Sequence, residues 1–231
     1  MESLLQNGLS ALGLPTENIP KLRRFSDLLL EKNKVMNLTA ITEEKDVATL
    51  HLLDSAALLN MADLSGKKVV DVGTGAGFPG MPMRIVKEDF SLTLLDSLNK
   101  RIDFLKDCCA ELGFTDVNCV HARAEDFAAG NRESFDFATS RAVANLSVLS
   151  ELALPLVKVG GQFLAMKSVD SEEEIAAAKS AIKTLGGKIS RVEDYTIPGT
   201  EVTHRVVVID KVSLTPAKYP RAFAKIKKQP L

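Results

Sequence analysis

The sequence has no tryptophan, two tyrosines and three cysteines among 231 residues. Cys108 and Cys109 are adjacent, and Cys119 has no partner at the spacing of a metal ligand. This pattern predicts neither a disulfide framework nor a zinc site, so we expect no metal and a reducing, cytoplasmic location. No apolar run approaches about 18 residues, and the first residues lack the basic segment of a signal peptide, so we expect no membrane association.

Neither sign of charge dominates the chain. The net charge is −1 at pH 7, which argues against a nonspecific nucleic-acid binder. The exception is the segment 211–231, which has no acidic residue and six basic ones: Lys211, Lys218, Arg221, Lys225, Lys227 and Lys228. Two interpretations stay open for it, a solvated end or an arm that gains affinity by releasing counterions from a polyanion.

The first 62 residues have a helical pattern, in which Leu22, Phe25 and Leu29 recur at helical spacing. A second apolar pattern follows Thr42. We expect these helices to pack their apolar sides on the sheet that follows. The expected regions are an N-terminal helical extension (1–65), a core (66–212) and a basic C-terminal tail (213–231).

Seven apolar, strand-like runs follow, separated by helical patterns. They lie at 69–72, 92–95, 117–120, 135–138, 162–165, 189–195 and 205–209. Alternation of apolar strands and helices is typical of a parallel sheet covered on both faces. The short link between the last two runs indicates an antiparallel pair. We therefore predict an α/β, Rossmann-like fold with a seven-stranded, mostly parallel sheet and an antiparallel final strand, the arrangement of class I S-adenosylmethionine (AdoMet) methyltransferases.

A glycine-rich loop follows the first strand-like run. Gly73, Gly75 and Gly77 precede a helix that Pro79 is expected to open. Glycine permits unusual backbone angles and lets a ligand approach without a Cβ in the way. Because the residues also match the dinucleotide pattern GxGxxG, the loop alone fits both NAD and AdoMet.

Two carboxylates help to separate these cofactors. Asp71 ends the first strand, where it either bonds to the loop or holds the cationic amino end of AdoMet, and where it would repel a pyrophosphate. Asp96 ends the next strand, where an acid accepts from both ribose hydroxyls of either cofactor. Asp71 therefore favours AdoMet. The polar segment 121–126 follows the third strand, where the adenine of AdoMet would rest.

Eight segments, in order along most of the chain, resemble one family. They are NLTAI (37–41), HLLDS (51–55), DVGTGAGFPG (71–80), LLDSLNKR (94–101), ARAE (122–125), SRA (140–142), AMK (165–167) and KYPR (218–221). With them the chain resembles the small-subunit (16S) ribosomal RNA guanine-N7 methyltransferases, also called the glucose-inhibited division protein B family. The resemblance implies AdoMet as cofactor, methyl transfer to N7 of a guanine, and ribosomal RNA or the small ribosomal subunit as partner. We expect a monomer.

The resemblance also implies roles for individual residues. Gly73 and Phe78 are implied as loop contacts to AdoMet, in addition to Asp71, Gly75 and Gly77 of the same loop. Asp96 is implied on the ribose side, and Ala124 and Glu125 on the adenine side. Arg141 is implied at the mouth of the site, near both cofactor and substrate. The basic residues expected to face RNA are Arg123, Lys167 and Arg205, with Lys218 and Arg221 of the tail.

The chemistry of guanine N7 shapes the expected mechanism. N7 carries an in-plane lone pair and no proton, so the enzyme needs no general base and must chiefly hold N7 in line with the methyl group. We expect Arg141 to position a phosphate or the cofactor carboxylate, and Phe78 to be the best-placed ring for stacking. His51 and Asp54, one helical turn apart, are expected to form a hydrogen-bonded structural pair rather than an acid–base pair.

Other functions fit parts of the sequence. A methyltransferase acting on another RNA, a protein or a small molecule would use the same cofactor loop. A non-catalytic regulator that binds AdoMet is a third alternative, because transfer to N7 requires no diagnostic catalytic side chain.

Overall fold

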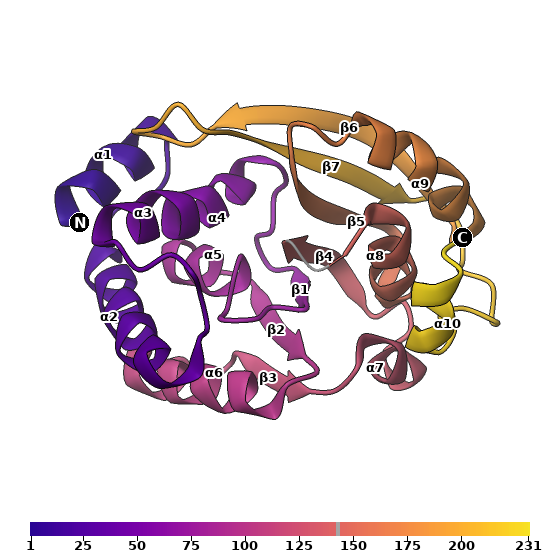
Figure 1. Cartoon of the computed structure of the whole chain (residues 1–231), viewed down its shortest axis with the longest axis horizontal. Coiled ribbons are helices and arrows are strands. Elements are labelled where there is room, and N and C mark those ends of the chain that lie inside the picture. The colour runs from indigo at the N-terminus through magenta and orange to yellow at the C-terminus, as the bar shows by residue number, and fades with distance from the viewer. Residues whose placement is uncertain (142–143) are drawn as a thin grey trace.

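A seven-stranded sheet runs through the middle of the molecule (Figure 1). The computed structural model describes residues 1–141 and 144–231; Ala142, part of the SRA segment, lies outside them. The strands are β1 (Lys68–Val72), β2 (Ser91–Asp96), β3 (Asn118–His121), β4 (Phe135–Arg141), β5 (Val157–Ser168), β6 (Gly187–Thr196) and β7 (Thr203–Lys211). Their order across the sheet is β3-β2-β1-β4-β5-β7-β6.

The pairing confirms the predicted topology. Strands β1 to β5 pair in parallel, whereas β7 pairs antiparallel with both β5 and β6. The fifth strand is longer than predicted, because it begins at Val157 rather than Gln162. Since the parallel strands share one direction, the carboxyl ends of β1, β2, β4 and β5 meet at one edge of the sheet, where open α/β folds place their ligands.

Helices cover the sheet. The longer ones are α1 (Glu2–Ala11), α2 (Ile19–Met36), α5 (Gly80–Val86), α6 (Asn99–Leu112), α7 (Ala124–Gly130), α8 (Leu146–Ala153), α9 (Glu172–Thr184) and α10 (Phe223–Lys228). The short ones are α3 (Glu44–Asp46), η1 (Val47–Leu53), α4 (Asp54–Ala56), η2 (Ala57–Asn60) and η3 (Leu154–Leu156). No helix of residues 1–141 or 144–231 is long and apolar enough to span a membrane.

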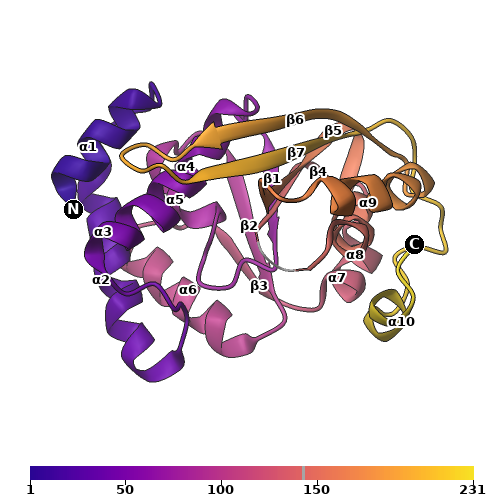
Figure 2. The ribbon, with the colours of Figure 1, turned by 45° about the horizontal axis from the view of Figure 1, so that its top comes forward.

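The core has one cluster on each face of the sheet. Along β7, Val206 and Val208 belong to the cluster that includes residues of the N-terminal helices, α5 and α6. Val207 and Ile209 belong to the cluster formed with α8, α9 and α10. This alternation follows from the period of two in a strand, and it is why near-continuous apolar runs predicted a sheet covered on both sides. Figure 2 shows the two sets of helices on either side of the strands.

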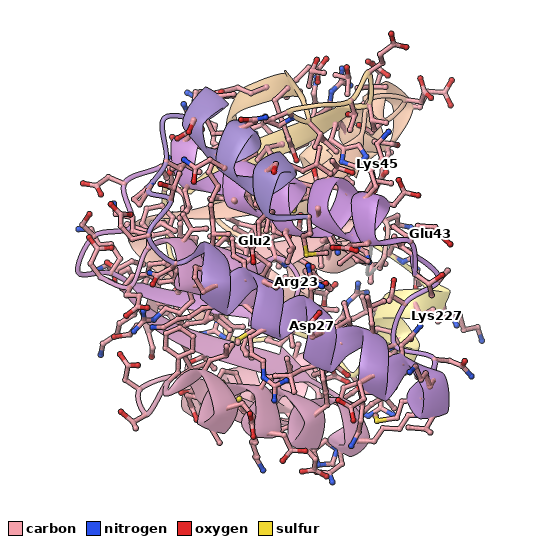
Figure 3. The ribbon with its side chains drawn as sticks, turned by 90° about the vertical axis from the view of Figure 1, so that its left-hand side faces the viewer. Glu2, Arg23, Asp27, Glu43, Lys45 and Lys227 are labelled. Carbon is pink, nitrogen blue, oxygen red and sulfur yellow. The ribbon has the colours of Figure 1, made fainter. Side chains whose placement is uncertain are left out.

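The N-terminal helices bury their apolar sides as predicted, but α1 and α2 pack chiefly against other helices, such as α5 and α6, rather than directly on the sheet. Leu22, Phe25 and Leu29 of α2 are buried against the first cluster. Arg23 and Asp27 lie on the outer side of the same helix (Figure 3), with 3.0 Å between the Arg23 Nε and an Asp27 carboxylate oxygen. The helical extension therefore contributes directly to the core.

Candidate active site

The glycine loop adopts the backbone that its composition predicted. The φ angles of Gly73, Gly75 and Gly77 are +70°, +60° and +100°, in the left-handed region that L side chains rarely adopt. A Cβ at Gly77 would also lie 2.8 Å from a methyl group of Leu105. Helix α5 begins at Gly80, and Pro79 is its N-cap. The sequence had predicted Pro79 as the first residue of the helix.

Asp71 holds this loop from beneath. Its Oδ2 accepts hydrogen bonds from the Thr74 hydroxyl at 2.6 Å and the Gly80 amide at 2.9 Å, and its Oδ1 accepts from the Thr139 hydroxyl at 3.3 Å. Burial raises the pKa of Asp71 to about 6, against the opposing effect of these bonds. The side chain has no exposed surface. Of the two roles considered for it, the contacts support bonding to the loop.

Asp96 continues the same support from the end of β2. Its Oδ2 lies 2.9 Å from the Gly75 amide and 3.3 Å from the Arg101 guanidinium, and its Oδ1 accepts from the Leu98 amide at 2.9 Å. It is buried apart from a small surface, yet it lines two neighbouring cavities. A contact between Asp96 and a ribose stays a prediction.

Two adjoining cavities lie over the loop. The larger has a volume of about 470 Å³ and is lined by Leu38, Thr39, His51, Gly73, Thr74, Gly75, Ala76, Phe78, Asp96, Ser97, Leu98, Arg101 and Arg141; we call it the loop cleft. The smaller, of about 120 Å³, is lined by Val72, Gly73, Leu95, Asp96, Ser97, Ala122, Arg123, Ala124, Glu125, Leu152 and Phe223; we call it the side cavity. Gly73, Asp96 and Ser97 line both, so the two form one continuous region along the carboxyl ends of β1 and β2.

Phe223 is a lining residue that the sequence did not reveal. It lies at the start of α10, in the basic tail, and it borders the side cavity together with Ala124 and Glu125. Its only signal in the sequence is an aromatic residue between Arg221 and Lys225, which gives no hint of which part of the sheet the tail reaches.

Arg141 stands at the end of β4 between three partners. Its Nη1 donates to the Leu50 carbonyl at 3.1 Å and to the Asp54 carboxylate at 3.2 Å, and its Nη2 lies 3.0 Å from Nδ1 of His51. The guanidinium carbon lies 4.8 Å from the centre of the Phe78 ring, within the range of a cation–π contact. Three hydrogen-bond partners from the segment 50–54 and the ring of Phe78 thus hold one guanidinium.

His51 is a neutral acceptor for Arg141. Burial, and then the charge of Arg141, lower the pKa of His51 to about 4. Since a guanidinium only donates, Nδ1 of His51 accepts, and Nε2 carries the proton toward the Thr39 hydroxyl at 2.7 Å. The expected direct bond between His51 and Asp54 is not found among the described residues. Arg141 bonds to both of them instead.

Phe78 is already covered by protein. The His51 ring stacks on it with 4.4 Å between centroids, and Phe25 meets it edge-on at 5.7 Å. Only 5% of Phe78 is exposed. The expectation that Phe78 stacks on a substrate base is therefore wrong for this arrangement; the ring supports His51 and Arg141.

A further cleft, of about 650 Å³, opens on the other side of Arg141. We call it the outer cleft. Its lining is Ile41, Leu50, His51, Asp54, Arg141, Met166, Lys167, Ser168, Glu174, Val202 and His204. His51 and Arg141 line both this cleft and the loop cleft. Apolar walls with a few convergent polar groups are typical of a site for a small molecule or a base.

Two basic residues expected at the RNA are held by carboxylates instead. Arg205 lies 2.6 Å from Asp194 and 2.7 Å from Glu172. Lys167, also largely buried, lies 2.6 Å from Glu174 and donates to the Ala144 carbonyl at 2.7 Å. An RNA contact by either residue would have to compete with these bonds, and it stays a prediction.

The basic tail is partly built into the protein. Lys211 is fully buried and donates to two backbone carbonyls, and Arg221 lies 2.6 Å from the fully buried carboxylate of Glu151. These two contacts correct the interpretation of all six basic residues as a solvated end or arm, because two of them stabilise the fold. The remaining ones, Lys218, Lys225, Lys227 and Lys228, are exposed; Lys227 is labelled in Figure 3. Arg123, at the start of α7, is exposed as well.

Comparison with known sequences places these features in a family context. Residues 18–203 match the family model described as GidB, rRNA small subunit methyltransferase G. A protein of Alkaliphilus metalliredigens named ribosomal RNA small subunit methyltransferase G is 45% identical, over the full length of both chains. A protein of the same name from Clostridium perfringens is 44% identical, over 99% of this chain and 98% of that one.

Solved structures share the fold at low identity. The crystal structure of TrmN from Thermus thermophilus aligns with 68% of this chain and 48% of that one, at a TM-score of 0.55 and 20% identity. That of M. jannaschii TYW2 in complex with AdoMet aligns with 70% of this chain and 76% of that one, at a TM-score of 0.56 and 14% identity. These likenesses show the fold alone.

Proposed function

The chain belongs to the rRNA small subunit methyltransferase G family, whose members methylate 16S ribosomal RNA with AdoMet, and we propose that it methylates N7 of a guanine. The loop cleft and the side cavity would hold AdoMet, and the outer cleft would receive the base. The single observation that carries this assignment is that Arg141 and His51 line both the loop cleft and the outer cleft, together the two large clefts of the site, so that two ligands would meet beside them.

The loop fits AdoMet on structural grounds. Gly73 and Gly75 line the loop cleft with backbone and no Cβ, so a ligand can lie directly against the chain. Asp96 stands at the junction with the side cavity, where Ala124 and Glu125 form the wall. These residues would bind the ribose and the adenine, respectively, and bound AdoMet would supply an electrophilic methyl group.

The residues of the site suit an acceptor that brings its own lone pair. His51 is neutral because its pKa lies near 4, and its accepting nitrogen is occupied by Arg141. It is therefore poorly placed to remove a proton from a substrate. Guanine N7 has no proton to remove, and its alkylation needs only alignment and exclusion of water. Ile41, Leu50 and Met166 supply apolar walls for this purpose.

A cationic base forms when N7 is methylated, and the site is suited to tolerate it. Asp54, whose carboxylate is fully buried, lines the outer cleft and pairs with Arg141. The cation that faces the clefts is thus compensated locally, which reduces repulsion toward the product. We further propose that the chain acts as a monomer and that the exposed basic residues contact RNA phosphates: Arg123, Lys218, Lys225, Lys227 and Lys228.

The test uses the whole protein, labelled AdoMet, and small ribosomal subunits from cells that lack this methylation, with naked 16S RNA in parallel. We expect label at one guanine, at which borohydride reduction and aniline treatment cleave the RNA because they act on N7-methylguanine. Label on another atom or base would contradict the N7 assignment, and an absence of label in both substrates would contradict the proposed reaction.

A matched pair of variants tests the cofactor site. Gly73→Val places a side chain at φ +70° in the loop cleft and is expected to abolish AdoMet binding in calorimetry. Gly113→Val introduces similar backbone strain, at φ +75°, after α6 and away from both large clefts. It should lower stability while leaving AdoMet affinity unchanged. Equal affinity in the two variants would reject the role of the loop.

A further inference from the structure

Asp54 is a fully buried carboxylate at the start of α4, in the N-terminal helical extension. Its Oδ2 lies 3.2 Å from Nη1 of Arg141. Its Oδ1 accepts from the Tyr195 hydroxyl at 2.6 Å and lies 2.8 Å from Nδ1 of His204. Both oxygens are thus bound, one by the residue between the two large clefts and the other by residues from two further strands.

The two residues behind Oδ1 form a fixed platform. Tyr195 on β6 and His204 on β7 are direct partners in the antiparallel register of those strands. Tyr195 keeps its proton, because burial and then the charge of Asp54 raise its pKa. Hydrogen bonding to Asp54 raises the pKa of His204, so it too favours donating to the carboxylate. With both donors on one oxygen, rotation of the carboxylate away from Arg141 would break two hydrogen bonds.

Arg141 in turn has donors to spare. A guanidinium carries five N–H groups. Among the described residues, Leu50, Asp54 and His51 engage three of them. The remaining donors belong to a group that lines both the loop cleft and the outer cleft. Their directions depend on how firmly the other three are held, since the planar fork turns as one unit.

We propose that Asp54 is a positioning residue for methyl transfer, which acts through Arg141 by fixing the orientation of the guanidinium between the two clefts. Tyr195 and His204 complete the support from β6 and β7. The inference rests on the proposed function for its catalytic consequence, but its effect on cofactor binding does not depend on the acceptor. It also gives the N-terminal extension a direct part in the site.

A double-mutant cycle tests this proposal, with Asp54→Asn, Arg141→Gln and the double variant. AdoMet affinity is measured by calorimetry without RNA, and kcat and KM are measured with small ribosomal subunits. We expect each single variant to lower kcat/KM about tenfold or more, and the double variant to be no worse than Arg141→Gln. Losses that multiply in the double variant would overturn the proposal, because Asp54 would then act independently of Arg141.

Two more variants separate positioning from stability. Tyr195→Phe removes one of the two donors to Oδ1 of Asp54 and should lower kcat/KM about threefold. If Asp54→Asn fails to fold, Tyr195→Phe takes its place in the double-mutant cycle with Arg141→Gln. Glu133→Gln weakens the ion pair with buried Lys211, away from both large clefts. It should reduce stability with kcat unchanged. A drop in kcat for Glu133→Gln as large as for Asp54→Asn would show that lost stability explains both.

The measurements distinguish a failure of the positioning role of Asp54 from a failure of the proposed methylation. If the wild-type protein methylates no RNA but the cofactor affinities show coupling between Asp54 and Arg141, the proposed acceptor is wrong and the positioning role stands. If methylation of guanine N7 is found without coupling in either affinity or kcat, the positioning role is wrong.

Discussion

Two fully buried carboxylates support the site, and the chain surrounds them differently. Asp71 accepts from two hydroxyls and one backbone amide, all neutral donors. Asp54 accepts from a guanidinium, a phenol and an imidazole. Asp71 carries its charge without a directly bonded cation, and burial raises its pKa to about 6. The charge of Asp54 has a direct counterpart in Arg141.

The difference indicates that Asp71 acts through the geometry of its oxygens and Asp54 through its negative charge. Beneath the glycine loop the carboxyl group is useful as an acceptor of fixed geometry, a task that a neutral amide oxygen also performs. Beside Arg141 the negative charge itself matters, since its removal leaves a largely buried cation without compensation. The same isosteric substitution should therefore have unequal effects at the two positions.

The largest expected effect is on stability. At neutral pH, Asp54→Asn should lower the free energy of unfolding by about 3 kcal/mol, because it strands the Arg141 charge. Asp71→Asn should lower it by less than about 1 kcal/mol, because the amide oxygen can accept from Thr74 and Gly80 while its NH₂ group faces Thr139. Urea denaturation followed by circular dichroism measures both. Equal losses would remove the distinction between the two carboxylates.

The next effect is on the pH dependence of stability. Burial raises the pKa of Asp71 from 3.8 to about 6, so the folded state favours the protonated carboxyl group. The contribution of this group to the free energy of unfolding is therefore complete below about pH 4 and is lost as the pH rises through about 6. Asp71→Asn is neutral throughout. Relative to wild type its free energy of unfolding should therefore gain about 3 kcal/mol across that interval. Parallel stability curves for the two proteins between pH 4 and pH 7 would contradict this expectation.

The smallest effect is spectroscopic and sharpens the description of the Arg141 cluster. In an NMR titration, His51 should stay neutral, with its proton on Nε2, until the pH falls to about 4. His204 should titrate above its ordinary value of 6.5 because of its bond to Asp54, and should return toward that value in Asp54→Asn. A His51 resonance that shifts near pH 6.5 would show that Arg141 does not hold it as an acceptor.

The same comparison shows what the sequence could reveal. The glycine loop and its two acids lie within residues 71–96, at the ends of adjacent strands, so the spacing alone brought them together. The Arg141 cluster draws on residues 50, 51, 54, 78, 141, 195 and 204. Only the topology places the start of β7 beside α4 and the end of β4, and no local pattern encodes that meeting.

Charge was the least predictable property. The family resemblance implied an RNA contact for Arg205, and the basic tail suggested one for Arg221, yet carboxylates from other elements pair with both. The sequence around a basic residue near the chain end does not show whether that residue pairs with a buried carboxylate such as that of Glu151. The strands and the loop followed from periodicity and glycine chemistry, which are local. The pairing of charges depends on tertiary contacts. The boundaries of the extension, the core and the tail at residues 65 and 212 depend on such contacts too, and they stay a proposal.

Arg141 borders two clefts at once, and this has a thermodynamic consequence. Asp54 restrains the guanidinium only in part, so a ligand that fixes its remaining donors from one cleft has already met part of the entropic cost for a ligand that uses it from the other. Reciprocity then requires each to raise the affinity of the other by the same factor. Cofactor and RNA would therefore bind with mutual cooperativity, and the departure of either product would loosen the hold on the one that remains.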